Sequence, residues 1–205
     1  MPRLFTGLEI PKDIGMRLAF LRGGLNRAVW IDQESYHITL RFIGDIDEHA
    51  ADEAADALGR IHRPSFDVTI DGIDSFGGPR PHSVFARVRQ TPALMELQAE
   101  QERILQRLGF TAEGRKFTPH VTIARTKGST QRDVADWLSI RGGFSAGSFR
   151  AERFVLFSSK ASRGGGPYIV EEAYPLDGQA RAPVLRPQPV AALERVPLKL
   201  TRLER

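Results

Sequence analysis

Cysteine is absent from the 205 residues of this chain. Disulfide bonds and metal sites built on thiolates are therefore excluded, and the composition is compatible with a reducing compartment. No apolar run approaches the roughly 20 residues that a membrane-spanning helix needs, and Met1-Pro2-Arg3 is not followed by the apolar segment of a signal peptide. From these absences we expect a cytoplasmic protein that does not contact a membrane.

An excess of one charge sign is also absent from most of the chain. Of the 29 basic and 25 acidic residues, six basic and two acidic residues fall within 178–205, which leaves 23 of each sign in 1–177. The net charge of +4 is therefore a property of the last residues alone. The charge of the body gives no nucleic-acid footprint, so recognition must depend on a particular site.

The most informative feature that is present is a repeated tetrad. His37-Ile38-Thr39-Leu40 is followed, 83 residues later, by His120-Val121-Thr122-Ile123. Because side chains alternate between the faces of a strand, His and Thr at i and i+2 point to one side and the apolar residues to the other. Two such strands can present two imidazoles and two hydroxyls to one substrate.

The tetrads lie at equivalent points of an internal repeat of about 80 residues. Each half reads as β-α-β-α-β: the first has strands over about 3–10, 36–43 and 66–73, with helices over about 12–25 and 47–60. In the second half we expect strands at 82–89, at the tetrad and at 149–157, helices at 92–108 and 130–139, and a closing strand at 167–174. The sequence therefore predicts an α+β domain over 1–176, with pseudo-repeats over 1–78 and 79–176.

A Pro-rich basic extension is predicted over 177–205. Pro183, Pro187 and Pro189 stand among Ala, Arg and Gln, which is typical of an extended linker. The last stretch, 192–205, carries five apolar side chains of Leu and Val, and we expect it to lie across the body or a partner. Its positive charge could add nonspecific affinity for RNA.

Two imidazoles facing one substrate can share acid–base work near neutral pH. One removes a proton from water and the other donates a proton to the leaving oxygen, which is what phosphodiester hydrolysis requires. Thr39 and Thr122 can donate to the non-bridging phosphate oxygens. Arg125 can add a charge-assisted contact, but ideal alternation sends it to the opposite face from His120, so its involvement requires the strand to have ended before it.

A metal site is the competing chemistry for two histidines. Neither tetrad has a third His or a carboxylate at ligand spacing beside it, so we expect no metal and no other cofactor. His49, His62 and His82 are expected to be structural or solvent-facing. Gly164-Gly165-Gly166 lacks the Lys-Ser/Thr of a P-loop and is expected to form a hairpin connection.

The chain resembles the two-histidine (2H) phosphoesterase superfamily, and within it the RNA 2′,3′-cyclic phosphodiesterases, or 2′-5′ RNA ligase family. That family is defined by two His-x-Thr/Ser-x motifs, which match His37–Leu40 and His120–Ile123, and by an arginine after the second motif, which matches Arg125. The resemblance covers about 1–176. Further similar segments are Arg3-Leu4-Phe5-Thr6-Gly7-Leu8, Phe42-Ile43-Gly44, Phe117-Thr118-Pro119, Leu156-Phe157-Ser158-Ser159 and Gly166-Pro167-Tyr168.

The resemblance implies a bilobal fold with two antiparallel sheets, helices on the outside and the histidines in a central cleft. It makes His37 the proton donor and His120 the proton acceptor, with Thr39, Thr122 and Arg125 on the phosphate. The implied reaction opens a terminal 2′,3′-cyclic phosphate of RNA to a 2′-phosphomonoester without metal. From the residues alone, which histidine donates is left open, because the two sites are pseudo-symmetric.

The residues are compatible with several activities of the same site. The same site could act on small nucleotide cyclic phosphates or on 2′-5′ linkages, with ligation as the weak reverse reaction, or it could only bind RNA ends without catalysis. Phe42 and Tyr168 are candidates for stacking on a nucleobase, with core packing as the alternative for each. We expect a monomer whose partners are RNA ends or nucleotides that bear a 2′,3′-cyclic phosphate.

Overall fold

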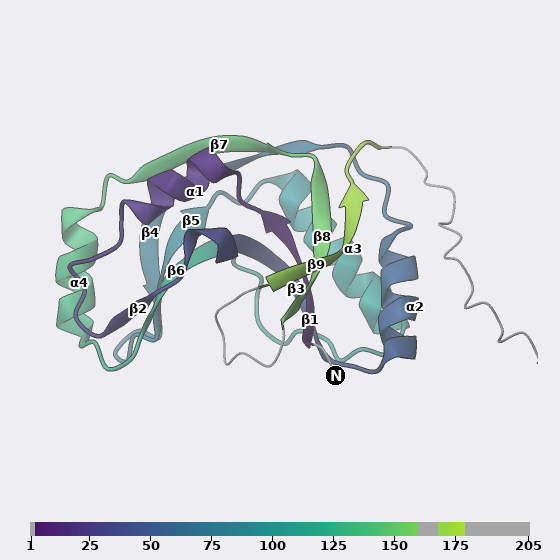
Figure 1. Ribbon diagram of the computed structural model, residues 1–205, viewed down its shortest axis with the longest axis horizontal. Helices are drawn as coiled ribbons and strands as arrows, with labels where there is room; N and C mark the ends of the chain where they lie inside the picture. Colours follow the sequence, from purple (N-terminus) through teal and green to yellow (C-terminus); the bar gives the residue numbers. More distant parts are fainter. Residues whose placement is uncertain (1–2, 160–167, 179–205) are drawn as a thin grey trace, which may run out of the picture.

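The computed structural model describes residues 3–159 and 168–178. Within them four α-helices surround one nine-stranded sheet in which every neighbouring pair is antiparallel (Figure 1). The prediction of an α+β fold built on antiparallel strands is confirmed. No helix in this part of the chain is long and apolar enough to cross a membrane.

The elements follow one another along the chain as the repeat predicts, with a few additions. They are β1 (Arg3–Glu9), α1 (Lys12–Ala19), β2 (Ala28–Trp30), the 3₁₀ turn η1 (Gln33–Ser35), β3 (His37–Asp45), α2 (Glu48–Leu58), β4 (Phe66–Phe76), β5 (Ser83–Val88), α3 (Pro92–Arg107), β6 (His120–Thr126), α4 (Gln131–Ile140), β7 (Ser145–Ala151), β8 (Arg153–Ser159) and β9 (Tyr168–Pro175).

Three of the helices begin at side chains that cap them. The carboxylate of Asp47 accepts a hydrogen bond from the Ala50 N–H, and the Thr91 hydroxyl accepts one from Leu94 N–H before Pro92 opens α3. Thr130 and Asp133 form a reciprocal capping box at α4. Each cap satisfies backbone donors that the first helical turn leaves without a partner.

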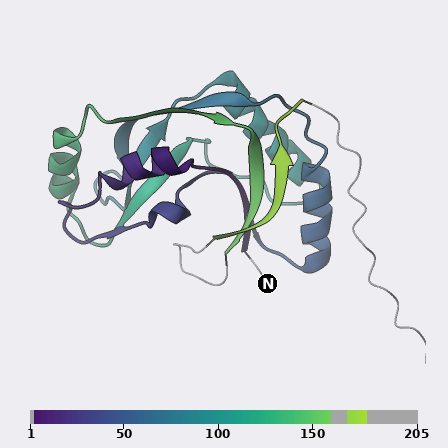
Figure 2. The same cartoon turned by 45° about the horizontal axis from the view of Figure 1, so that its top comes forward.

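The two antiparallel sheets that were expected form a single sheet, because β3 pairs with β6. This sheet has two lobes that meet at a single pair of residues. Its order is β7-β4-β5-β6-β3-β1-β8-β9, with β2 added beside β6. Between β6 and β3 only Ile38 and Val121 pair. We call β9-β8-β1-β3 the first lobe and β7-β4-β5-β6 with β2 the second lobe; they form the right and left parts of Figure 1, and β8 and β9 run side by side in Figure 2.

The lobes do not coincide with the two halves of the sequence. β4, the last strand of the first half, pairs with β5 and β7 in the second lobe, whereas β8 returns to pair with β1 in the first lobe. Helix α1 packs on β7, and α3 packs on β3. The first half therefore contributes β2, β4 and α1 to the second lobe, and the second half contributes β8, β9 and α3 to the first lobe. These exchanges depend on contacts between residues that are far apart in the sequence.

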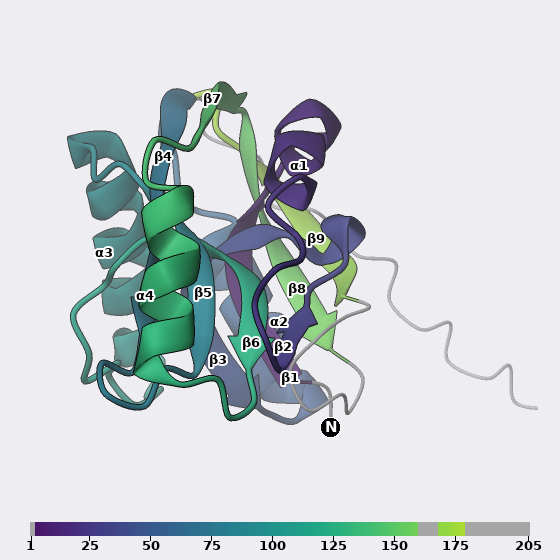
Figure 3. The same ribbon diagram turned by 90° about the vertical axis from the view of Figure 1, so that its left-hand side faces the viewer.

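The main core lies between the sheet and the helices. Figure 3 shows α3 and α4 on the outer side of the strands. Apolar residues from this face of the strands pack with Leu18 of α1, Leu97 of α3 and Trp137 of α4, all of which are nearly inaccessible. The opposite face of the sheet carries a smaller apolar cluster around Phe5, Val155 and Phe157. We call this opposite face the site face.

Several boundaries differ from the sequence prediction. The helix expected over 12–25 ends at Ala19. Gly23 and Gly24 adopt positive φ, which a helix does not allow, and the loop that follows α1 is largely exposed except for Leu21 and Leu25. The strand expected over 149–157 is two strands, β7 and β8, interrupted at Glu152. The short strand β2 was not predicted. The expected Pro-rich extension and the hairpin at Gly164–Gly166 lie outside the described residues.

Candidate active site

The two histidines of the tetrads begin β3 and β6 and are held in the same way. The Nδ1 of His37 lies 2.8 Å from the carbonyl oxygen of Ser35, and the Nδ1 of His120 lies 2.7 Å from that of Thr118. A carbonyl oxygen only accepts hydrogen bonds, so Nδ1 carries the proton in both rings. Nε2 is then the nitrogen that each neutral ring leaves available for proton transfer.

The lobe junction brings the tetrads together in an antiparallel arrangement. Because Ile38 pairs with Val121, His37 lies next to Thr122 and Thr39 lies next to His120 across the junction. Both hydroxyls and both imidazoles are half-buried, whereas Ile38 and Val121 are fully buried in the main core. Each histidine therefore shares the site face with its own threonine and with the threonine of the other tetrad.

Each imidazole also has aromatic neighbours. The ring centroid of His37 lies 5.0 Å from that of Phe5 and 4.9 Å from that of Tyr168. The His120 centroid lies 4.9 Å from that of Phe76 and 5.2 Å from that of Phe85. These rings restrict rotation of the imidazoles and remove water from around them.

This burial changes the protonation of the histidines. Burial lowers the pKa of His37 to about 4, although the hydrogen bond to Ser35 opposes the shift, and the positive charges of His120 and Arg125 lower it further. Burial likewise lowers the pKa of His120, against the hydrogen bond to Thr118. Both rings are therefore neutral at pH 7 without a ligand, and a nearby phosphate anion would raise their pKa values.

Arg125 reaches the site face because β6 contains a bulge. Ile123 is an extra residue in the pairing with β5: Thr122 opposes Phe85, and Ala124 opposes Val84. The bulge turns Ala124 into the core and Arg125 toward the face of His120. The expectation that β6 must have ended before Arg125 was wrong, since the strand continues to Thr126.

The same bulge occurs in the first tetrad. Leu40 is the extra residue there, because Thr6 opposes Arg41 and Gly7 opposes Thr39. Phe42 consequently lies on the site face, 48% exposed, with its ring centroid 5.6 Å from that of Phe5. Phe42 in the first lobe and Arg125 in the second therefore occupy equivalent positions beside the two histidines.

The candidate stacking residues join the aromatic cluster around His37. Tyr168 begins β9, is half-buried and packs edge-on against His37 and Phe5. Phe42 presents about half of its surface to solvent. Phe42 and Tyr168 can therefore pack within the aromatic cluster and can also stack on a nucleobase. Their role in base recognition stays a prediction.

The sequence interpretation missed the aromatic residues that support the histidines. Phe5 and Phe85 are 80 residues apart, and Phe76 and Phe157 are 81 apart, which matches the repeat offset. In the structure Phe5 stacks on Phe157 with centroids 5.0 Å apart, and Phe76 stacks on Phe85 at 4.1 Å. Aligning the halves at this offset would have identified all four.

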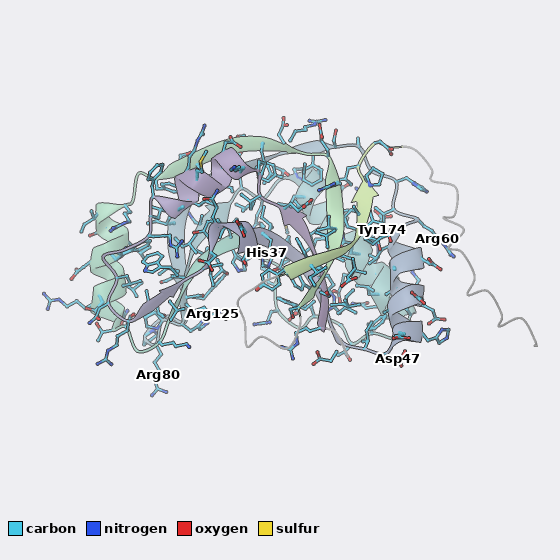
Figure 4. The ribbon with its side chains drawn as sticks, viewed as in Figure 1. His37, Asp47, Arg60, Arg80, Arg125 and Tyr174 are labelled. Carbon is cyan, nitrogen blue, oxygen red and sulfur yellow. The ribbon has the colours of Figure 1, made fainter. Side chains whose placement is uncertain are left out.

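Two further histidines and a hollow lined by arginines lie away from His37 and His120 or at the edge of the site face. His82 is exposed and its ring lies 6.2 Å from Phe76, on which His120 also packs, whereas His49 lies on α2 and contacts Glu53 at 3.7 Å. A hollow between α2 and α3, lined by Arg60, Arg103 and Arg107 among others, contains neither histidine. Figure 4 shows Arg60 near α2, far from His37 and Arg125 in the middle of the molecule.

Within residues 3–159 and 168–178, no three His, Cys, Asp or Glu side chains gather in a group able to hold a metal ion. The side chains that the site face does bring together are acid–base and hydrogen-bonding groups: two imidazoles, two hydroxyls and the guanidinium of Arg125. Such a set can activate water, protonate a leaving oxygen and hold an anion.

Paired His-x-Thr-x strands on a two-lobed antiparallel sheet define a two-histidine phosphoesterase. Comparison with known families agrees: residues 13–163 match the model of the 2′-5′ RNA ligase superfamily. The chain belongs to this superfamily.

Curated relatives agree with that assignment, and a solved structure has a similar fold. A protein of Aeropyrum pernix named RNA 2′,3′-cyclic phosphodiesterase is 35% identical over 141 residues, which cover 67% of this chain and 80% of the relative. One of the same name from Thermotoga maritima is 40% identical over 132 residues, covering 61% and 70%. The fold resembles that of E. coli LigT complexed with 3′-AMP, with a TM-score of 0.70 and 24% identity over 86% of this chain and 99% of LigT.

Proposed function

We propose that this protein hydrolyses the 2′,3′-cyclic phosphate at the end of an RNA to a 2′-phosphomonoester, without a metal ion. The observation that carries the proposal is the matched pair of imidazoles, each with Nδ1 bound to a backbone carbonyl and Nε2 left for the substrate. The relatives named RNA 2′,3′-cyclic phosphodiesterase support the choice of substrate.

In the proposed reaction His120 Nε2 accepts a proton from water as the water oxygen attacks phosphorus. The bond between phosphorus and O3′ breaks, and His37, protonated when the anionic phosphate is bound, donates its proton to O3′. Thr39, Thr122 and Arg125 hold the non-bridging oxygens, whose charge grows in the transition state. The product is a 2′-phosphate with a free 3′-hydroxyl, and one further proton exchange with water returns both histidines to their starting state.

The assignment of His37 as donor and His120 as acceptor follows the family pattern. The proximity of the two rings supports their joint action, since the charge of a protonated His120 is strong enough at His37 to lower its pKa. Ligation is the reverse of this reaction, and the high concentration of water favours hydrolysis. We further propose that the protein acts as a monomer in the cytoplasm, which size-exclusion chromatography with light scattering and cell fractionation would test.

The test uses an oligoribonucleotide that ends in a 2′,3′-cyclic phosphate, incubated with the protein and EDTA. We expect turnover to a 2′-phosphate, identified by ³¹P NMR. A 3′-phosphate product or a strict requirement for added metal would contradict the proposed mechanism. Tight binding without turnover would indicate an RNA-end-binding module, and turnover of cyclic mononucleotides alone would indicate the small-nucleotide alternative.

A further inference from the structure

Arg87 is a cation on the site face that the proposed mechanism does not use. It lies on β5 directly opposite His120 of β6, and paired residues of neighbouring strands point to the same face. Val84, Ala86 and Val88 of β5 belong to the main core, so the alternate residue Arg87 projects from the other side. It is exposed.

A glycine on the next strand determines where the guanidinium of Arg87 lies. A Cβ added to Gly72 of β4 would fall 2.2 Å from Nη2 and 2.6 Å from Nε of Arg87. The guanidinium therefore lies directly against the backbone of Gly72, in space that any side chain would fill. Gly72 also has a φ of +87°, which favours glycine.

The guanidinium of Arg87 forms no ion pair with any residue that the structure describes, in contrast to its neighbours. Arg89, two residues along the same face, pairs with Asp71 at 3.4 Å. The other carboxylate nearby on β4, Asp74, accepts a hydrogen bond from the Ser75 N–H. The positive charge of Arg87 is therefore available to an anion.

The equivalent position in the first lobe has the opposite charge. Glu9 of β1 opposes His37 as Arg87 opposes His120, and the carboxylate of Glu9 is bound to Arg153 at 2.7 Å. An anionic chain that reaches the histidines therefore finds an available cation beside His120 and a neutralised carboxylate beside His37. Because the charge beside the two histidines differs, an anionic chain is expected to bind along the site face in one orientation.

We propose that Arg87 binds the phosphodiester on the 5′ side of the terminal nucleotide, so that the site recognises an RNA chain rather than a mononucleotide. This inference rests on the proposed function. Strands are about 4.8 Å apart, so a guanidinium on β5 that leans over β4 lies within about 10 Å of His120. A chain whose last phosphate is cyclic continues only through its 5′ oxygen, and a guanidinium matches phosphate with two parallel hydrogen bonds.

The test compares two substrates and two variants. The substrates are uridine 2′,3′-cyclic phosphate, which lacks a 5′ phosphate, and the dinucleotide UpU that ends in the same cyclic phosphate. Arg87→Gln is expected to raise KM for the dinucleotide about tenfold more than for the mononucleotide, the size of one charge-assisted contact. With a longer oligoribonucleotide that ends in the same cyclic phosphate, the slope of log(kcat/KM) against log salt should become shallower by about 0.7.

Arg89→Gln is the matched control, because it removes the same charge one residue past the end of β5, at a position already paired with Asp71. It should leave the ratio of the two KM values unchanged. Equal effects of Arg87→Gln on both substrates, or no effect on either, would overturn the role of Arg87. If the wild-type protein turned over neither substrate, the proposed function itself would fail.

Discussion

At the scale of single residues, the two histidines have the same hydrogen-bonding arrangement but different neighbours. Each donates Nδ1–H to the carbonyl two residues before it. At the equivalent positions after the two bulges, however, the first lobe has Phe42 and the second has Arg125. The two lobes are thus symmetric in the imidazoles and their hydrogen bonds and asymmetric in the side chains beside them.

The roles of the histidines can be separated with a substrate whose leaving atom needs no proton. Replacing O3′ of the cyclic phosphate by sulfur gives a thiolate leaving group. We expect His37→Ala to lower kcat/KM by about 10²–10⁴-fold on the oxygen substrate and by much less on the sulfur substrate. His120→Ala should be impaired on both, because water must still be activated. Rescue of His120→Ala instead of His37→Ala would show that the roles are exchanged.

The burial of His37 also predicts how stability depends on pH. Its pKa is about 4 in the folded protein and about 6.5 when unfolded, so the unfolded chain binds the extra proton between these values. The stability that His37 contributes as a neutral ring is present above about pH 6.5 and is lost as the pH falls toward 4. In denaturant titrations between pH 6.5 and 4, the unfolding free energy of His37→Gln should fall less steeply with falling pH than that of the wild type. The difference in slope should be at most about 1.4 kcal/mol per pH unit.

The wild-type protein, measured over the same pH range, is the reference for that measurement. A His37→Gln variant whose stability falls as steeply as that of the wild type between pH 6.5 and 4 would contradict the account of His37.

At the scale of elements, a buried ion pair fixes β3 to α3 behind the site. Arg41 follows the bulge of β3, is 6% exposed, and its guanidinium contacts Glu102 of α3 and the carbonyl of Thr111. Removing one member leaves the other buried without its partner. Glu102→Gln should therefore lower the free energy of unfolding by about 3 kcal/mol, measured by denaturant titration.

The matched control is the Arg3–Asp45 pair, which also joins neighbouring segments of the first lobe at 3.0 Å but is exposed. Arg3→Gln should have no measurable effect on stability, because water screens such pairs. Equal stability of Glu102→Gln and the wild type would show that the buried pair does not hold α3 against β3.

The elements also show what the sequence could predict. The tetrads, the repeat and most helices follow from local patterns of period 2 and 3.6, so they were predictable. The bulges at Leu40 and Ile123 break the period of 2, and strand alternation alone therefore assigned Arg125 to the wrong face. β2 has only three residues, Ala28–Trp30, and depends on pairing with β6, which no local pattern reveals.

At the scale of the whole molecule, the exchange of strands between halves makes the fold one unit. β4 belongs to the first half of the sequence but pairs only with strands of the second, and β8 returns to β1. Pairing of this kind cannot be read from one sequence, because it depends on contacts between distant residues. The two His-x-Thr-x tetrads meet at the junction, which needs both halves of the sequence.

This exchange predicts that neither half folds alone. A fragment of residues 1–78 has no partner for β4, and one of residues 79–178 has no β1 for β8 to pair with. Circular dichroism and denaturant titration of each fragment should show no cooperative unfolding, and mixing them should restore it. Cooperative unfolding of the isolated 1–78 fragment would contradict this prediction.

The two imidazoles are proposed to act on one substrate as a unit. The most direct measurement is kcat/KM on the cyclic-phosphate oligoribonucleotide for the wild type, His37→Ala, His120→Ala and the double variant. Groups that act together are not additive, so each single change should cost at least about 10²-fold and the double change little more than either. Retention of more than a few per cent of the activity in either single variant, or losses that multiply in the double variant, would contradict the claim.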